Sequence, residues 1–180
     1  CVNTMRPRAD ARRMKLSLSV SAPNAVVRGD PVRLEQILDN LLSNAIKYTP
    51  PGGEIEVHVE SDADVAMLRV RDSGKGIAPE LLTRIFDLFM QGETTIDRSE
   101  GGLGVGLTLV KKLVHLHRGT VHAHSRGTGS GSEFVVRVPL ASEDLPAPQR
   151  TPVAVTAEPR RILLIEDNQD KMHTMAKALL

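Results

Sequence analysis

Four polar side chains in the first third of the chain recur at helical spacing. Gln36, Asn40, Asn44 and Lys47 are separated by steps of four, four and three residues, so they lie on one face of a predicted helix whose other face is apolar. An asparagine carbonyl oxygen is a hard, neutral ligand for Mg²⁺, and a lysine ammonium group supplies a point charge for phosphate. The stripe therefore suits a magnesium triphosphate, although a solvated helix face would show the same spacing.

A carboxylate followed by two glycines ends a strand-like segment at DSGKGI, residues 72–77. Asp72 could accept a hydrogen bond from the exocyclic amine of adenine, whereas guanine would present a carbonyl oxygen and repel it. Gly74 and Gly76 would let the backbone approach a flat base closely. The same residues could equally form a tight turn that binds nothing.

A glycine-rich segment, EGGLGVGL at residues 100–107, runs directly into a predicted helix. Its glycines would expose backbone N–H groups at the helix N-terminus, where unpaired donors and the helix dipole favour phosphate. The segment is not a Walker loop, because no Gly-Lys-Ser/Thr follows, and it lacks the G-x-G-x-x-G spacing of a dinucleotide fold. By itself it only suggests an anion site.

Helices and strands must position these three segments. Asp30 is the predicted cap of the helix that carries the polar stripe, Pro31 lies in its first turn, and TPPGG at residues 49–53 ends it. A short helix is predicted after Pro79 and a buried helix over residues 105–117. Alternating patterns predict strands at residues 15–20, 54–60, 67–72, 120–125 and 132–140, the second and third forming a hairpin. The residues before Lys15 are basic and show no clear pattern.

Composition narrows the classes of function. An apolar content of 41% in 180 residues is enough for a packed core, and a net charge of +1 gives no field that favours nucleic acid or anionic membranes. Aromatic residues are only 2%, which leaves little for base stacking, and no apolar run approaches the roughly 20 residues needed to cross a bilayer. The single cysteine, Cys1, fits a reducing cytoplasm. Because the chain begins with Cys rather than Met, we expect it to be a piece of a longer cytoplasmic or membrane-anchored protein.

Taken together and in this order, the segments resemble the histidine kinase branch of the family that includes the gyrase, Hsp90 and MutL ATPases. NLLSNAIKYT (40–49) is similar to its N box, DSGKGI (72–77) to its first glycine box, IFDLFMQGE (85–93) to its phenylalanine box, GGLGVGL (101–107) to its second glycine box and GSGSEF (129–134) to its last glycine motif. The resemblance covers about Lys15 to Leu140. It implies an α/β fold of the Bergerat type, a two-layer sandwich of a mixed β-sheet against α-helices.

The resemblance also implies roles for residues at matching positions. Asn44 would hold Mg²⁺ with support from Asn40, Lys47 would meet phosphate and Tyr48 would pack against the adenosine. Asp72 would bind the adenine amine.

The remaining implied contacts lie in the glycine boxes and the lid. The adenine wall would be shaped by Gly74, Gly76 and Ile77, and the phosphates would be held by Gly102, Leu103, Gly104, Val105, Gly106 and Leu107. Arg98 would reach the terminal phosphate from an ATP lid at residues 91–102, whose base Phe86 and Phe89 would anchor. Arg118 stands where the family often has glycine, so the geometry of the turn after the last helix is in question.

The phosphoacceptor of such a kinase is a histidine, usually followed by an acidic residue, and none of the six histidines here has one. We therefore expect no catalytic residue in this segment and a histidine-bearing dimerisation domain upstream. RRILLIEDNQD (160–170) resembles the start of a receiver domain, in which Glu166 and Asp167 would help to bind Mg²⁺, although an incidental strand with an acidic end is an alternative. The predicted boundaries are 1–140 for the ATP-binding domain, 141–159 for a Pro/Ala-rich linker and 160–180 for a truncated receiver of a hybrid two-component kinase.

Two other classes of function and one metal site compete with this interpretation. A nucleotide-blind docking module would be expected to lack Asn44 or Asp72, and both are present. A gyrase-like or MutL-like ATPase would need a water-activating glutamate in the N box, but Glu35 lies five residues before Asn40 and off the polar stripe. The histidines at 115, 117, 122 and 124 have no Cys or nearby carboxylate to complete a zinc site, so we expect them to be solvated surface residues.

Overall fold

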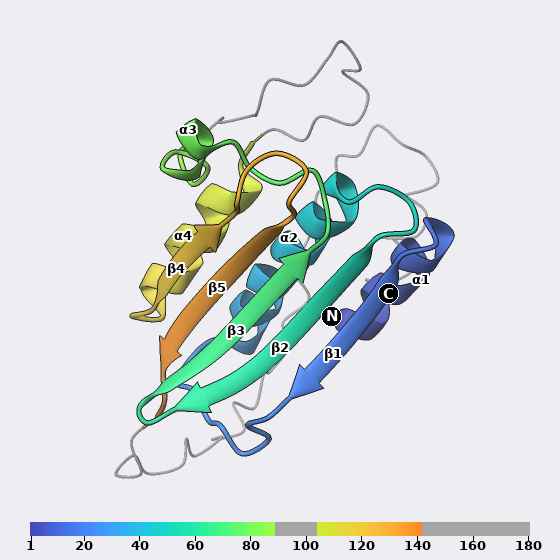
Figure 1. Ribbon diagram of the computed structural model, residues 1–180. Coiled ribbons are helices and arrows are strands. Elements are labelled where there is room, and N and C mark those ends of the chain that lie inside the picture. The colour runs from blue at the N-terminus through green and yellow to red at the C-terminus, as the bar shows by residue number, and fades with distance from the viewer. Residues whose placement is uncertain (89–103, 142–180) are drawn as a thin grey trace, which may run out of the picture. The chain divides into compact units, whose positions relative to one another are not determined.

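A computed structural model describes residues 1–88 and 104–141 of the chain. Five strands form one sheet in the order β1-β2-β3-β5-β4, in which β1 runs parallel to β2 and every other pair is antiparallel (Figure 1). The strands are β1 (Lys15–Val20), β2 (Glu54–Asp62), β3 (Val65–Asp72), β4 (Thr120–His124) and β5 (Ser132–Pro139). The helices are α1 (Val2–Ala11), α2 (Pro31–Tyr48), α3 (Pro79–Leu82) and α4 (Gly106–Leu116).

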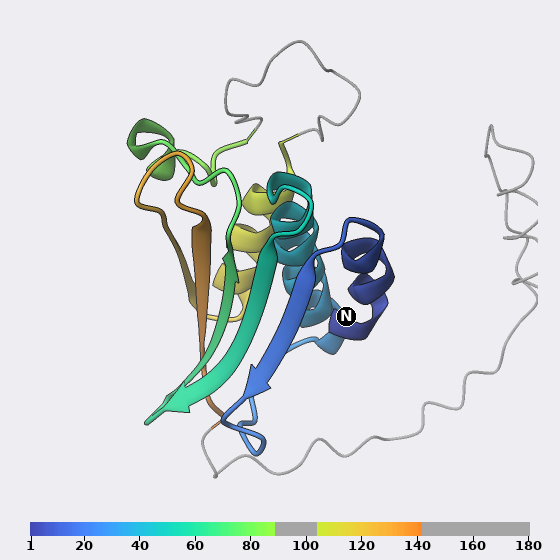
Figure 2. The same ribbon diagram turned by 45° about the vertical axis from the view of Figure 1, so that its right-hand side comes forward.

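Helices α1, α2 and α4 cover one face of the sheet, and the core lies between the two layers (Figure 2). Alternate strand residues face the helices, as a period of two requires, and Ile55, Val57 and Val70 are at most 1% exposed. Ile37 and Leu41 of α2 are buried against them. The predicted two-layer sandwich of a mixed sheet and helices is therefore confirmed.

The N-terminus of α2 forms as its sequence predicts. Asp30 caps the helix, because its carboxylate accepts from the backbone N–H groups of Val32 and Arg33 at 2.9 and 3.3 Å. Pro31 occupies the first turn, where a missing N–H costs nothing.

Within the described residues no helix is long and apolar enough to span a membrane.

Helix α1 is the element that the sequence did not predict. It buries Val2, Met5 and Ala9 beside α2 although Pro7 lies inside it, and an internal proline normally argues against a helix. A ten-residue helix is stabilised mainly by packing against its neighbours, which local sequence does not report. Arg12 follows α1 and donates to the carbonyl oxygen of Ile46 near the C-terminus of α2.

The turn after α4 keeps its geometry despite Arg118. That residue adopts the left-handed conformation with φ 57°, the conformation in which glycine is usual after a helix. At Gly119 a Cβ atom would overlap the carbonyl oxygen of Arg137 on β5, so the glycine is needed for the close approach of α4 and the sheet.

Candidate nucleotide-binding site

Asp72 ends β3 with its carboxylate buried and almost fully hydrogen-bonded. The side chain is 6% exposed, and its Oδ1 accepts from the N–H of Gly74 at 2.8 Å and of Ser132 at 3.3 Å. Oδ2 accepts from the hydroxyl of Ser132 at 2.5 Å. A carboxylate offers about four acceptor positions, so three donors leave it able to accept one more, such as an exocyclic amine. Sequence reasoning missed Ser132, whose only signal was its place inside the last glycine motif.

The two glycines after Asp72 serve close contacts between backbone segments. A Cβ atom at Gly74 would lie 2.6 Å from the carbonyl oxygen of Tyr48, and the N–H of Lys75 donates to that same oxygen at 3.0 Å. Gly76 has φ +69°, and a Cβ atom there would overlap the carbonyl oxygen of Gly127. These contacts join the end of α2 and the β4–β5 loop to the segment after β3. The close approach of these glycines to a flat base stays a prediction.

The β4–β5 loop lies beside the segment that follows β3 (Figure 1). The N–H of Gly131 donates to the carbonyl oxygen of Gly74 at 3.0 Å, and the N–H of Gly129 donates to that of Lys75 at 2.6 Å. The N–H of Ile77 donates to the hydroxyl of Ser125 at 3.0 Å. Backbone groups and a serine hydroxyl thus fix the Asp72–Ile77 segment along its length.

Near the middle of α2, Asn40 lies beside Gly106, the first residue of α4. Its Nδ2 donates to the carbonyl oxygen of Gln36 at 2.8 Å, so its Oδ1 is the atom left to face another group. A Cβ atom at Gly106 would lie 3.0 Å from that oxygen. At the opposite ends of the two helices, the N–H of Asp30 donates to Nε2 of His117 at 3.1 Å. The helices are therefore antiparallel, with the start of α4 beside the middle of α2.

This arrangement leaves the last turns of α2 extending beyond the start of α4. With a rise of about 1.5 Å per residue, Tyr48 lies about 12 Å further along α2 than Asn40. The N-terminus of α4, with its unpaired N–H groups and positive dipole end, points along this stretch. Asn44 and Lys47 lie between Asn40 and Tyr48. The Asp72 turn and the start of α4 therefore meet opposite ends of one helical stretch that carries amide and ammonium groups.

The exposed end of this stretch contains the only tyrosine of the chain. Tyr48 is 42% exposed, and the Nζ of Lys47 lies 4.9 Å from the centre of its ring, within the range of a cation–π interaction. Asn44 is half-buried. The side chains of Tyr48 and Asn44 are therefore both accessible to a ligand.

The remaining predicted site residues fall into two groups. Gly104 has φ +68° and Val105 is 37% exposed at the start of α4, while Ile77 and Leu107 pack against the core. Phe86 packs edge-on against Phe134 with ring centres 6.4 Å apart. Outside the described residues lie Phe89, Arg98, Gly102, Leu103, Glu166 and Asp167, so the predicted lid and receiver contacts stay predictions.

The expectation that the histidines near α4 are all solvated surface residues is wrong for His117. Its ring is half-buried, its Nδ1 lies 2.7 Å from the carbonyl oxygen of Leu113, and its Nε2 accepts from Asp30. Because the sequence does not reveal that Asp30 lies 87 residues away beside α4, this contact was not predictable. His122 and His124 are exposed on one face of β4, and no cluster of metal-binding side chains is found among the described residues.

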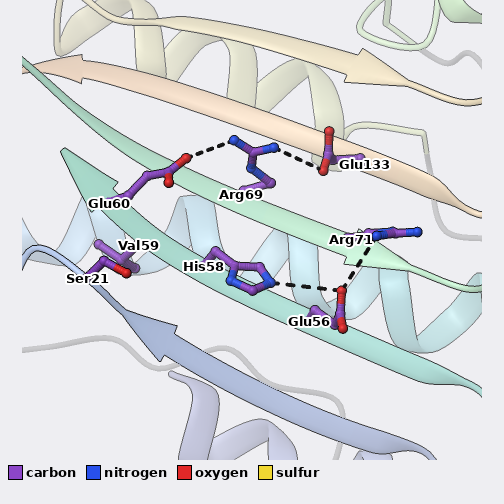
Figure 3. Close-up of a pocket in the computed structure, with 8 residues that line it drawn as sticks. All are labelled: Ser21, Glu56, His58, Val59, Glu60, Arg69, Arg71 and Glu133. Carbon is purple, nitrogen blue, oxygen red and sulfur yellow. Dashed lines mark hydrogen bonds and ion pairs between the residues drawn. The ribbon is translucent and has the colours of Figure 1, made fainter. Parts of the chain in front are cut away.

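The opposite face of the sheet carries a separate, charged hollow of about 280 Å³ (Figure 3). Arg69 on β3 pairs with Glu60 at 2.8 Å and with Glu133 at 3.5 Å, and Arg71 pairs with Glu56 at 3.9 Å. The hydrogen bond that the Arg69 guanidinium donates to Glu60 raises the pKa of the guanidinium above its ordinary value. The acidic and basic side chains of this hollow thus neutralise one another across the strands.

Known proteins resemble this chain over most of its length. Residues 29–142 match a family described as histidine kinase-, DNA gyrase B- and HSP90-like ATPases. The chain is 36% identical over 181 residues to the circadian input-output histidine kinase CikA of Synechococcus elongatus, covering 99% of the chain and 24% of that protein. It is 43% identical over 120 residues to the sensor histidine kinase RcsC of Escherichia coli, covering 67% of the chain and 12% of that protein.

Solved structures show the same likeness. Full-length ShkA in complex with AMPPNP superposes with a TM-score of 0.68 at 31% identity, covering 78% of this chain and 28% of that one. The catalytic domain of the histidine kinase ThkA superposes with a TM-score of 0.66 at 25% identity, covering 76% and 87%. The chain thus spans at most about a quarter of the curated relatives described above, and nearly the length of an isolated catalytic domain.

Proposed function

Because this chain belongs to the family of histidine kinase-, DNA gyrase B- and HSP90-like ATPases, we propose that it is the ATP-binding part of a hybrid sensor kinase. It would bind ATP with Mg²⁺ and donate the terminal phosphate to a histidine on a separate dimerisation domain. One observation carries the proposal. The Asn40–Tyr48 stretch of α2 contacts the glycine turn after Asp72 at one end and the glycine start of α4 at the other.

The chemistry of the residues in this region fits ATP. The Asp72 carboxylate keeps one acceptor position for the adenine amine, and Gly106 leaves the start of α4 open beside Asn40. Asn44, supported by Asn40, would hold Mg²⁺ through an amide oxygen, which is the kind of hard ligand this ion prefers. When bound, the ion offsets the charge of the phosphates. Lys47 would contact a phosphate, and the protein's part in the transfer is mainly placement of the terminal phosphate.

The proposal requires a second domain that supplies the phosphoacceptor histidine. None of its six histidines is followed by an acidic residue, so the phosphoacceptor belongs to another domain of the same kinase. Residues 1–140 would act as the ATP-binding domain, 141–159 as a linker and 160–180 as the start of a receiver. The ATP-binding domain would work in the cytoplasm.

Titration of the chain with ATP and Mg²⁺ by isothermal calorimetry tests the proposal. Saturable binding is expected, and Asp72→Asn should weaken it by about 10- to 100-fold, because a hydrogen bond to a buried charged group contributes about 1.5–3 kcal/mol. Glu56→Gln, the same change of acid to amide on the opposite sheet face, is the control and should bind as the wild type does. A wild-type chain without saturable binding would overturn the proposal, and equal affinity of Asp72→Asn would remove the adenine assignment.

A gyrase-like or MutL-like ATPase is the alternative that an ATP turnover assay separates from this proposal. Glu35 is the acid nearest to the N box, but its side chain is exposed. Steady ATP turnover by the chain without any histidine domain, abolished by Glu35→Gln, would favour that alternative. The presence of Asn44 and Asp72 disfavours a nucleotide-blind docking module.

A further inference from the structure

Ser125 joins three backbone segments through one hydroxyl group. It follows β4, and its Oγ accepts from the N–H of Ile77 at 3.0 Å and from the N–H of Gly127 at 3.2 Å. The same hydroxyl donates to the carbonyl oxygen of Gly131 at 2.7 Å, and the carbonyl oxygen of Gly127 lies further away at 3.3 Å as a second acceptor for the same proton. A serine hydroxyl has one proton and two acceptor positions, so these three bonds use its full capacity.

Two of the segments that Ser125 joins lead directly to Asp72. Ile77 ends the glycine turn that begins at Asp72, and Gly131 precedes Ser132, which holds Oδ2 of Asp72. A Cβ atom at Gly131 would overlap the backbone carbonyl oxygen of Asp72, so the loop and the strand end are in direct contact. Ser132 begins β5 and is paired with Asp72, so a movement of the loop away from Ile77 would strain the start of β5, where the Ser132 hydroxyl orients the carboxylate.

We propose that Ser125 is a positioning residue for base recognition. It holds the β4–β5 loop against the Asp72–Ile77 segment, and so fixes the direction in which Asp72 accepts from a purine amine. This role rests on the proposed function of Asp72. Its hydrogen-bond partners are backbone groups of the glycine turn and of the loop, not side chains of the sheet core. Loss of the hydroxyl would leave two backbone N–H groups without this acceptor.

The proposal predicts a selective effect on the base side of the ligand. Ser125→Ala should weaken ATP binding by about tenfold, the equivalent of ~1.4 kcal/mol. It should also reduce the preference for ATP over GTP, while inorganic tripolyphosphate with Mg²⁺ binds as it does to the wild type. Ser125→Thr keeps the hydroxyl and should restore binding to within about twofold, whereas Ser125→Cys, a weaker donor, should be intermediate.

Calorimetric titrations with ATP, GTP and tripolyphosphate, each with Mg²⁺, test this selectivity. Ser130→Ala is the matched control, because Ser130 is exposed in the same loop and contacts Gly127 through its backbone N–H rather than through its hydroxyl. Equal losses for all three ligands in Ser125→Ala, or unchanged binding of ATP and GTP, would overturn the proposal. Ser125→Thr and Ser125→Cys carry the test if Ser125→Ala fails to fold.

Amide hydrogen exchange of Ile77 without nucleotide separates this proposal from the proposed function. The amide should exchange faster in Ser125→Ala than in the wild type and in Ser130→Ala. Unchanged protection in Ser125→Ala would defeat the positioning role alone, even if the wild type binds ATP. A wild type that binds no ATP would defeat the proposed function and the recognition role with it.

Discussion

The two sides of the proposed nucleotide site are built from different kinds of groups. The base side, the Asp72–Ile77 segment with the β4–β5 loop, is joined by backbone N–H and carbonyl groups and by two serine hydroxyls. The phosphate side, the Asn40–Lys47 stretch with the start of α4, presents side chains. Among the described residues, the side chains of Asn44 and Lys47 form no hydrogen bond, and Lys47 rests over Tyr48.

The difference has a consequence for binding. Backbone groups in a hydrogen-bonded turn lose little freedom when a ligand arrives, whereas a lysine side chain carries up to about 2 kcal/mol of rotamer entropy that ordering removes. The base side is therefore prepared for its ligand before binding, and the phosphate side is completed by it. Substitutions on the base side should damage the fold and the affinity together, and those on the phosphate side should damage affinity alone.

The largest effect is expected for Gly131→Ala on the base side. Gly131 has φ +71° and its Cβ atom would overlap the carbonyl oxygen of Asp72, so strain and overpacking together should cost about 2–4 kcal/mol. Gly129→Ala is the matched control, because its φ of +83° carries similar strain but nothing lies within 4 Å of the added atom. Urea unfolding should show a loss of about 1–2 kcal/mol there. Equal losses would contradict the close contact at Gly131.

Replacing Lys47 should weaken only the binding of the phosphates. Lys47→Met keeps the apolar stem and should lower the affinity for ATP by about tenfold, because it removes a charge-assisted contact, while the affinity for adenosine stays unchanged. Asp72→Asn should weaken both ligands. Lys111→Met on the exposed surface of α4 is the control and should bind ATP normally. A parallel loss of adenosine binding in Lys47→Met would mean that the ammonium acts through Tyr48 rather than on phosphate.

The sequence predicted most of the helices and strands that form the base side and the phosphate side. The strands, the capped helix α2 and helix α4 carry strong local patterns, and the periodicity of their apolar residues follows directly from burial on one face. The hairpin of β2 and β3 was also predicted, with strand ends within about two residues of those observed, and so was a short helix at Pro79. Helix α1 was missed because packing rather than pattern stabilises it.

The contacts that complete the base side could not be predicted in the same way. Ser132 lies 60 residues from Asp72 and Ser125 lies 48 residues from Ile77, and a single sequence does not say which loop meets which strand end. The glycine spacing did indicate a close backbone approach. The predicted approach to a base stays a prediction, and the contacts of Gly74 with Tyr48 and of Gly76 with Gly127 are revealed only by the folded chain.

His117 contacts Asp30 where the end of α4 meets the start of α2, far from both sides of the site. His117→Ala should cost about 1 kcal/mol in urea unfolding, because it removes an acceptor from the N–H of Asp30. His115→Ala on the exposed face of the same helix should stay within about 0.5 kcal/mol of the wild type. If the lengthwise position of α4 against α2 affects phosphate binding, the affinity for tripolyphosphate should fall in His117→Ala and not in His115→Ala. Equal stability and affinity in the two variants would show that packing alone sets the register.

Arg118, directly after this contact, offers the smallest and most local test, because its backbone strain lies outside both sides of the site. A non-glycine residue at φ 57° costs about 1–2 kcal/mol, and glycine would relieve this but add about 0.5–1 kcal/mol of chain entropy to the unfolded state. Arg118→Gly should therefore stabilise the chain by about 0.5–1 kcal/mol in urea unfolding and leave ATP affinity unchanged. Arg118→Ala keeps the Cβ atom and should gain nothing. Equal stability of the two variants would mean that the turn carries no strain, whereas a change of ATP affinity in Arg118→Gly would extend the phosphate side to the far end of α4.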